Sequence, residues 1–190
     1  PVHQMPGSRG YGEPLSKFIE LKAEVLFMGV LEKSQLWLLS ANSGYGFLAQ
    51  AESLCVTQKA GKQVYTLKQG EKLLSPQKTA EKAELVLVSS QGRILTFPAS
   101  DVNVLPKGRG VKLIGIKKDD FDQEKDELCH VLALKTGEAG ILYSASRHLN
   151  LDASRLDPTR GSRASRGKFL PQGYRQVSRL AIKDADEKNN

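Results

Sequence analysis

The chain has 190 residues, which is long enough for one domain or two with a sizeable core. It carries 28 Lys and Arg against 21 Asp and Glu, and this net charge of +7 favours an anionic partner. The two cysteines, Cys55 and Cys129, match neither a disulfide framework nor a zinc site, so a reducing compartment fits. No apolar run approaches the ~20 residues of a membrane helix, so a membrane span is not predicted.

The first 35 residues contain short apolar runs that are typical of strands, and the longest of them is Val25 to Leu31. The sequence opens at Pro1 rather than Met and in the middle of this pattern. We therefore expect a fragment of a longer polypeptide whose first structural unit is incomplete.

Three segments then read as strand, tight turn and strand: residues 36–48, 85–97 and 131–143. Their runs of Val, Ile, Leu and aromatic residues are broken at Gly44, Gly92 and Gly137, which are 48 and 45 residues apart. Short apolar runs separated by Ser-Gly, Gln-Gly or Thr-Gly predict β-hairpins.

A second repeat combines glycine with basic residues. Its copies begin at Arg9, Lys59, Lys107 and Arg166, and each precedes an apolar run that we expect to be a strand. The copies are anchored at Gly12, Gly61, Gly110 and Gly167, at spacings of 49, 49 and 57 residues. Propeller blades repeat every ~40–50 residues. With about four strands per unit, the prediction is an all-β, propeller-like fold that places a cationic turn in each blade.

Charge is unevenly distributed along the chain. Residues 155–183 contain eight Lys or Arg and one acid, whereas residues 119–127 contain six acids and one Lys. The acidic stretch has no calcium-loop spacing and is interpreted as a solvated loop between strands. The polar residues 184–190 are predicted to form a disordered tail.

The segments Asn42 to Phe47, Lys59 to Lys62 and Gly92 to Gly110 resemble the C-terminal domain of the A subunit of bacterial DNA topoisomerase IV, and the resemblance runs from about Pro6 to Ile182. It implies a β-pinwheel, in which four-stranded blades exchange a strand and DNA follows the outer rim. We expect one DNA-binding domain over 1–183 and an incomplete or open ring. The blades would be a partial one at about 1–35 and complete ones at about 36–83, 84–127 and 128–183.

Glycine lets a turn approach a phosphate closely, and the flanking cations neutralise phosphates and release counterions. The resemblance therefore implies DNA contact by the basic residues of the repeat. These candidates are Arg9, Lys59, Lys62, Lys107, Arg109, Lys112, Arg160, Arg163, Arg166 and Lys168. The alternative for any single copy is a hairpin turn with solvated charges.

No catalytic or metal-binding residue is predicted. In the family, the tyrosine that cleaves DNA directly follows an arginine, whereas Gly, Val or Leu precedes all five tyrosines of this chain. By resemblance the fragment is a non-catalytic part of a type II topoisomerase and needs no cofactor itself, while the whole enzyme uses ATP and Mg. The implied partners are duplex DNA, the N-terminal breakage-reunion region of the same polypeptide and the ATPase B subunit, in the cytoplasm of a bacterium at the nucleoid.

Two alternatives remain. The gyrase A subunit carries a Gln-Arg-Arg-Gly-Gly-Lys-Gly type box, to which residues 107–112 and 160–168 are the nearest approaches, so a gyrase-type wrapping domain is one alternative. The other is a propeller-like interaction scaffold whose basic surface meets an acidic protein. Strand passage, decatenation and supercoil relaxation would belong to the whole enzyme.

Overall fold

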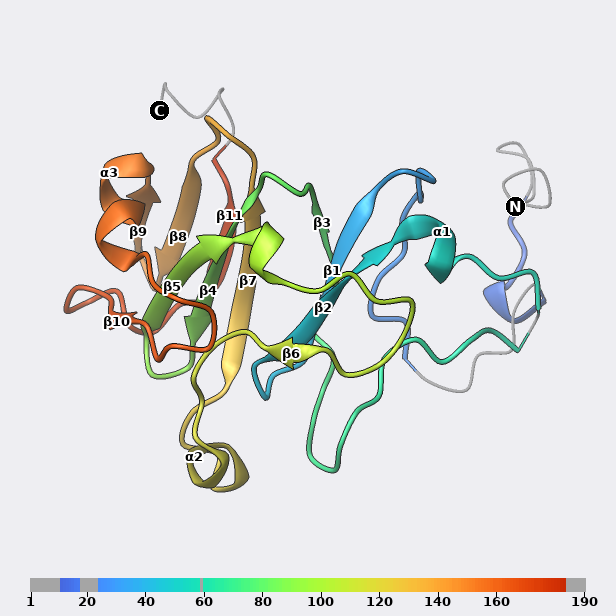
Figure 1. The fold of residues 1–190 in the computed structure, drawn as a ribbon, viewed down its shortest axis with the longest axis horizontal. Helices are drawn as coiled ribbons and strands as arrows, with labels where there is room; N and C mark the ends of the chain where they lie inside the picture. The colour runs from blue at the N-terminus through green and yellow to red at the C-terminus, as the bar shows by residue number, and fades with distance from the viewer. Residues whose placement is uncertain (1–10, 18–23, 59, 184–190) are drawn as a thin grey trace.

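The described strands form three antiparallel sheets, one at the centre of Figure 1 and two that overlap at its left. The structure is a computed structural model that describes residues 11–17, 24–58 and 60–183. Arg9, Lys59 and the predicted tail at 184–190 lie outside this description. No helix in the described part of the chain has the length and apolar character needed to cross a membrane.

Most regular structure is β-strand. Sheet 1 has the order β3 (Gln77–Thr79), β1 (Leu36–Ser40), β2 (Tyr45–Gln50), β6 (Val111–Lys112). Sheet 2 has the order β10 (Lys168–Phe169), β5 (Arg93–Pro98), β4 (Glu84–Ser89), β7 (Leu128–Leu134). Sheet 3 has the order β11 (Arg179–Ile182), β8 (Gly140–Ser144), β9 (Arg147–Leu151). The helical segments are short: η2 (Leu15–Lys17), α1 (Ala51–Leu54), η3 (Ala99–Asp101), α2 (Lys118–Asp122), α3 (Ala153–Leu156) and η4 (Asp157–Thr159).

Neighbouring sheets exchange strands. β6 follows β5 in the chain but pairs with β2 of sheet 1, and β10 follows β9 but pairs with β5 of sheet 2. Each of these two sheets therefore contains a short strand that comes from beyond the next hairpin. The sheets consequently do not coincide with the blade ranges 36–83, 84–127 and 128–183, which divide the chain by sequence alone. The all-β prediction is confirmed.

Two of the three predicted hairpins are confirmed. β1 pairs with β2 around Gly44, and β4 pairs with β5 around Gly92. The third prediction, residues 131–143, is wrong because β7 pairs with β4 of sheet 2 and the chain then crosses at Gly137 into sheet 3. The hairpin of sheet 3 is instead β8–β9, whose turn contains Ala145 at φ 50°. Local turn signals mark where a strand ends, but not which strand it pairs with.

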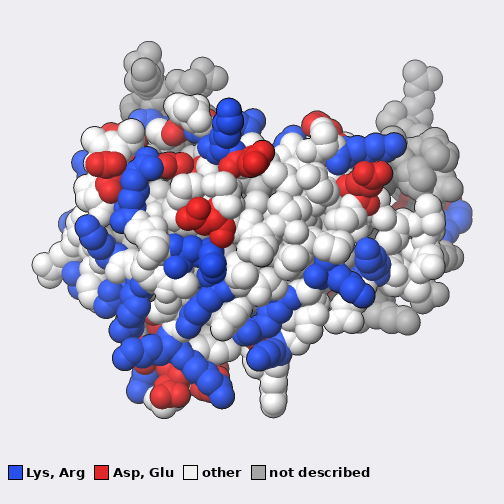
Figure 2. Space-filling view, in the orientation of Figure 1, with Lys and Arg blue, Asp and Glu red and all other residues white. Residues whose placement is uncertain are grey.

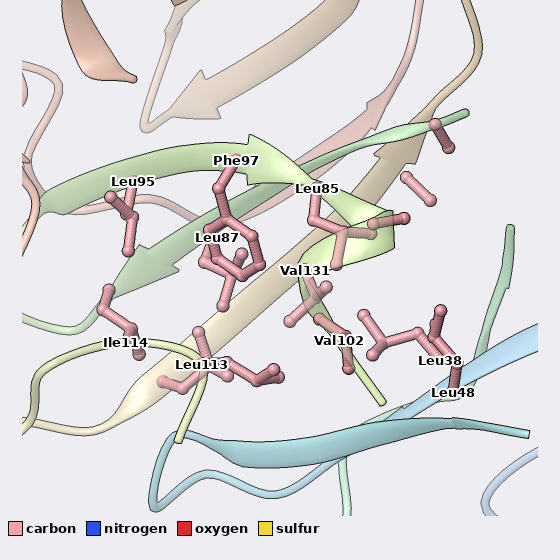
Figure 3. Close-up of a cluster of buried hydrophobic side chains, with 14 of the residues drawn as sticks. Leu38, Leu48, Leu85, Leu87, Leu95, Phe97, Val102, Leu113, Ile114 and Val131 are labelled. Carbon is pink, nitrogen blue, oxygen red and sulfur yellow. The ribbon is translucent and has the colours of Figure 1, made fainter. Parts of the chain in front are cut away.

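The core lies between the sheets. Leu85 and Leu87 of β4 belong to the cluster that also contains Leu38 of sheet 1, and Figure 3 shows this cluster. The intervening residues Val86 and Val88 belong to a second cluster with strands of sheet 3. Because successive side chains of a strand point to opposite faces, β4 is buried on both sides. This explains why its sequence is continuously apolar rather than alternating.

Two other sequence predictions need correction. Val25 to Leu31 forms no strand, and its side chains are exposed, with Val30 at 80% of its full accessibility. An apolar run becomes a strand only beside a pairing partner, and no described strand pairs with this segment. Within the acidic stretch, Lys118–Asp122 forms one helical turn, α2, rather than an irregular loop. Phe121 of α2 packs against the core, while Asp119 and Asp120 lie in its first turn.

Candidate nucleic-acid interface

Two copies of the basic repeat occupy equivalent positions in sheets 1 and 2. Arg109-Gly110 leads into β6 and Arg166-Gly167 leads into β10. Both glycines have positive φ, 78° and 70°, and a Cβ on either would clash with a carbonyl oxygen, that of Gly46 on β2 or that of Ile94 on β5. Only glycine allows the exchanged strand to begin this close to its partner.

The other two copies differ. Gly12 and Gly61 also have positive φ, 77° and 74°, but a Cβ on either would meet nothing within 4 Å. The strand expected after Gly61 is reduced to an isolated bridge between Tyr65 and Gly108. Of the four copies in the sequence, only those at Gly110 and Gly167 are therefore seen to lead into an exchanged strand.

Arg109 is largely enclosed by a carboxylate and an aromatic ring. Its Nη2 donates to Glu71 Oε1 at 2.5 Å, and its Nε donates to the same oxygen at 3.2 Å. Its guanidinium carbon lies 3.5 Å from the centroid of the Tyr45 ring. The Glu71 side chain is only 2% exposed and that of Arg109 is 22% exposed. The charge of Arg109 is thus compensated inside the protein.

Burial and the charges of this pair shift the pKa values of Glu71 and Tyr65. Burial raises the pKa of Glu71, but the hydrogen bonds from Arg109 and from the Lys68 backbone N–H, among others, together with the charge of Arg109 outweigh burial, so the pKa falls below its ordinary value. Burial, together with the charge of Glu71, raises the pKa of Tyr65. The Tyr65 hydroxyl donates to the Tyr45 carbonyl at 2.9 Å, and its ring stacks on Phe47. Arg109 is therefore part of a structural cluster in sheet 1.

Two further candidate arginines contact acids at the surface. Arg166 Nη2 lies 3.4 Å from Asp120 Oδ2 of α2. Arg160 forms an ion pair with Glu84 and lies 3.3 Å from Asp157. The Arg160 side chain is 47% exposed and that of Arg166 is 39% exposed, so both can still contribute to the surface potential.

Two candidates bond to backbone carbonyls between sheets 1 and 2. Lys112 Nζ donates to the carbonyl of Ile116 at 2.6 Å, and Arg163 Nη1 donates to the carbonyl of Lys112 at 2.8 Å. Both side chains are half-buried. These bonds tie β6 to the segment that follows it and to the loop before β10.

The remaining described candidates are exposed. Lys62 donates to the carbonyl of Ser53 at 3.2 Å. Lys107 and Lys168 form no ion pair with any residue in the described part of the chain. No described structure accompanies the predictions for Arg9 and Lys59.

Basic side chains are frequent on the face of the molecule that Figure 2 shows. In Figure 2, Lys and Arg cover much of the lower half of the view, over the region of β10, β6 and α2 in Figure 1. Acidic side chains lie mainly in the upper half and at the lower end. A hollow of about 1200 Å³ opens within this basic region. Its lining includes six Lys or Arg and four acids, namely Lys68, Lys72, Arg109, Lys112, Lys117, Lys118, Glu71, Asp122, Glu124 and Glu127.

Sequence reasoning missed two arginines beside β10. The guanidinium carbons of Arg93 and Arg175 lie 3.8 and 4.6 Å from the centroid of the Phe169 ring. Phe169 directly follows the candidate Lys168 and is 47% exposed. The position of Arg93 beside the turn glycine Gly92 could have marked it as a candidate. Nothing in the sequence indicates that Arg175 contacts the same ring as Arg93.

Comparison with known sequences identifies relatives over most of the chain. Residues 83–121 match the family described as DNA gyrase C-terminal domain, beta-propeller. The A subunit of DNA topoisomerase 4 from Pseudomonas aeruginosa is 33% identical over 96% of this chain and 25% of that protein. Its counterpart from Escherichia coli K12 is 29% identical over 94% of this chain and 24% of that protein. The chain thus spans about a quarter of the length of these relatives.

Solved structures share the fold. The E. coli ParC C-terminal domain superposes with a TM-score of 0.86 and 28% identity, over 97% of this chain and 75% of that one. The DNA gyrase A C-terminal domain superposes with a TM-score of 0.69 over 90% of this chain and 58% of that one, and its 19% identity supports the fold alone. These matches confirm the propeller or pinwheel prediction.

Proposed function

Because the chain is a homologue of the topoisomerase IV A subunit with the fold of the ParC C-terminal domain, we propose that it binds duplex DNA through its basic face. The observation that carries the proposal is the concentration of Lys and Arg over β6, β10 and α2 (Figure 2). β6 and β10 start from equivalent Arg-Gly turns in adjacent sheets, so the face repeats from one sheet to the next. A repeated cationic surface suits the regularly spaced phosphates of DNA.

The binding is directed to the backbone rather than to base edges. The strands presented at this face, β6 and β10, are only two residues long, and their cations lie on the strands and on the turns that precede them. Neither element has the form of a helix or ribbon that could enter the major groove. The domain therefore distinguishes DNA by its path and deformability, such as the geometry of a crossing.

The relatives support a role for the domain within a whole enzyme. Joined to the breakage-reunion region of its own polypeptide and assembled with the ATPase B subunit, the domain would help to select DNA segments for strand passage. Decatenation of daughter chromosomes and relaxation of supercoils would be the outcomes, with ATP and Mg used outside this domain. The site of action would be the bacterial nucleoid.

A salt titration tests the proposal. A fluorescent 30-base-pair duplex is titrated with the protein between 50 and 200 mM salt. For about four to six phosphate contacts, the logarithm of the affinity should fall with a slope of about −4 to −5 against the logarithm of the salt concentration. Two unrelated sequences of equal length should bind equally. No binding at 50 mM salt, or stronger binding to an acidic polypeptide of equal charge than to DNA, would contradict the proposal.

A gyrase-type wrapping domain is the second candidate, favoured by the match of residues 83–121 to the gyrase family. Ligation of nicked circles in the presence of the protein separates the two candidates. Topoisomerase IV-type binding should change the linking number only slightly. A large shift of one sign in the linking number would support wrapping instead.

A further inference from the structure

Two arginines from distant parts of the chain lie against one exposed aromatic ring of β10, that of Phe169. We propose that Arg93 and Arg175, held against Phe169, form a clamp that binds one phosphate of the DNA backbone. The inference rests on the proposed function and assigns a particular phosphate site within it.

The spacing of the two guanidinium groups suits one phosphate. Their carbons lie 3.8 and 4.6 Å from the same ring centroid, so they cannot be more than 8.4 Å apart. A charge-assisted hydrogen bond from a guanidinium to a phosphate oxygen spans about 2.8 Å. With both groups directed to the same side of the ring, one phosphate can accept bonds from both.

Both side chains are fixed before any ligand arrives. Arg93 lies opposite Phe169 in the β5–β10 register, and its Nη1 donates to the carbonyl of Gly167 at 3.3 Å. Arg175 Nε donates to the carbonyl of Leu170 at 3.1 Å. The backbone of Arg175 also lies so close to Gly92 that a Cβ on that glycine would clash with it. Such preorganisation lowers the entropy lost on binding.

The clamp lacks an internal counter-ion. In the described part of the chain, no carboxylate forms an ion pair with Arg93 or Arg175, in contrast to Arg109, Arg160 and Arg166. Two like charges on one ring repel each other, and the face of the ring compensates them only in part. An added anion would remove this repulsion.

Sheet 1 contains a similar stacked arginine whose charge is compensated by a carboxylate. There Tyr45 lies opposite Lys112 in the β2–β6 register, Arg109 stacks on Tyr45, and the carboxylate of Glu71 accepts from Arg109. Sheet 2 repeats the stacked aromatic and guanidinium with the strands interchanged, since Arg93 is on β5 and Phe169 on β10. In sheet 2 the counterpart of Arg109, Arg166, has its own carboxylate in Asp120, whereas the two arginines stacked on Phe169 have none among the described residues. A backbone phosphate would supply that negative charge.

The test compares R93Q, R175Q, the double variant and F169L with the wild type in the salt titration described above. R155Q is the matched control, because Arg155 is exposed on α3 and its replacement removes the same single charge. The double variant should bind DNA about 10-fold more weakly near 0.1 M salt, with a slope smaller by about 0.9, as for one phosphate. Each single variant should lose nearly as much as the double, because one phosphate needs both groups.

F169L should weaken binding about three-fold with an unchanged slope, since it keeps both charges but removes the ring face. Thermal unfolding of R175Q, whose side chain is exposed, verifies that the loss is not one of folding. If the wild type binds and the double variant behaves like R155Q, the clamp is overturned while the proposed function stands. If the wild type does not bind DNA at 50 mM salt, the proposed function itself fails.

Discussion

Arg109 and Glu71 form a buried ion pair between β6 and the loop before β3, with an Nη2–Oε1 distance of 2.5 Å and the Glu71 side chain 2% exposed. The two residues are 38 positions apart, so the pair joins the exchanged strand to the body of sheet 1. Arg109, one of the predicted DNA contacts, therefore has mainly a structural role. This relationship leads to the first two predictions.

Replacing Arg109 with Ala should lower the free energy of unfolding by about 3 kcal/mol, because it leaves the enclosed carboxylate of Glu71 without a counter-ion. Urea unfolding monitored by the buried Trp37 measures this change. The control is Lys78→Ala, which removes an exposed cation 3.7 Å from Glu32 and should cost less than about 0.5 kcal/mol. Equal losses in the two variants would show that the Arg109 pair contributes no more than a surface contact.

The same pair predicts a pH dependence of stability. The pKa of Glu71 in the folded protein lies below its ordinary value of 4.5, so its contribution is fully present above pH 4.5 and is lost as the pH falls through the folded-state pKa. Glu71→Gln should be less stable than the wild type at neutral pH. The two stability curves should then converge in acid, as measured by urea unfolding from pH 7 to pH 3. A constant difference across that range would contradict the prediction.

Gly167 should be far less replaceable than a turn glycine in open space. Gly167→Ala adds a Cβ against the carbonyl of Ile94 in addition to the strain of a positive φ, whereas Gly137 has a similar φ of 86° and nothing within 4 Å. Gly137→Ala should cost about 1 kcal/mol from backbone strain alone. We expect Gly167→Ala to cost at least about 2 kcal/mol more, from the shift or loss of β10. Thermal unfolding of both variants gives the comparison, and equal losses would rule out the close approach.

Neutralising Asp120 should strengthen DNA binding. Its carboxylate lies 3.4 Å from Arg166 and lowers the positive potential where α2 adjoins the basic face. Asp120→Asn should raise the affinity at 50 mM salt about three-fold, with a smaller gain at 200 mM because salt screens exposed charges. Glu81→Gln removes an equal charge from an exposed position as the control. An equal gain in both variants would indicate a general effect of net charge instead.

Two arginines of the basic cluster at 160–168 also make structural contacts. Arg163 donates to the carbonyl of Lys112 at 2.8 Å, and Arg160 forms an ion pair with Glu84. These contacts fasten the loop before β10 to β6 of sheet 1 and to β4 of sheet 2, so alanine at both positions should cost stability as well as DNA affinity. A binding experiment on this cluster therefore needs an unfolding measurement beside it.

Local chemistry in the sequence determined the all-β class, the hairpins around Gly44 and Gly92, and the recurrence of Arg-Gly turns. These features depend on residues a few positions apart, and turn geometry constrains them directly. Only the tertiary structure decided that β7 pairs with β4 rather than β8, and that Arg109 faces Glu71 while Arg93 and Arg175 face Phe169. The physical reason is distance along the chain: strand exchange brings together residues 38 to 82 positions apart, and no local pattern specifies which charges meet there.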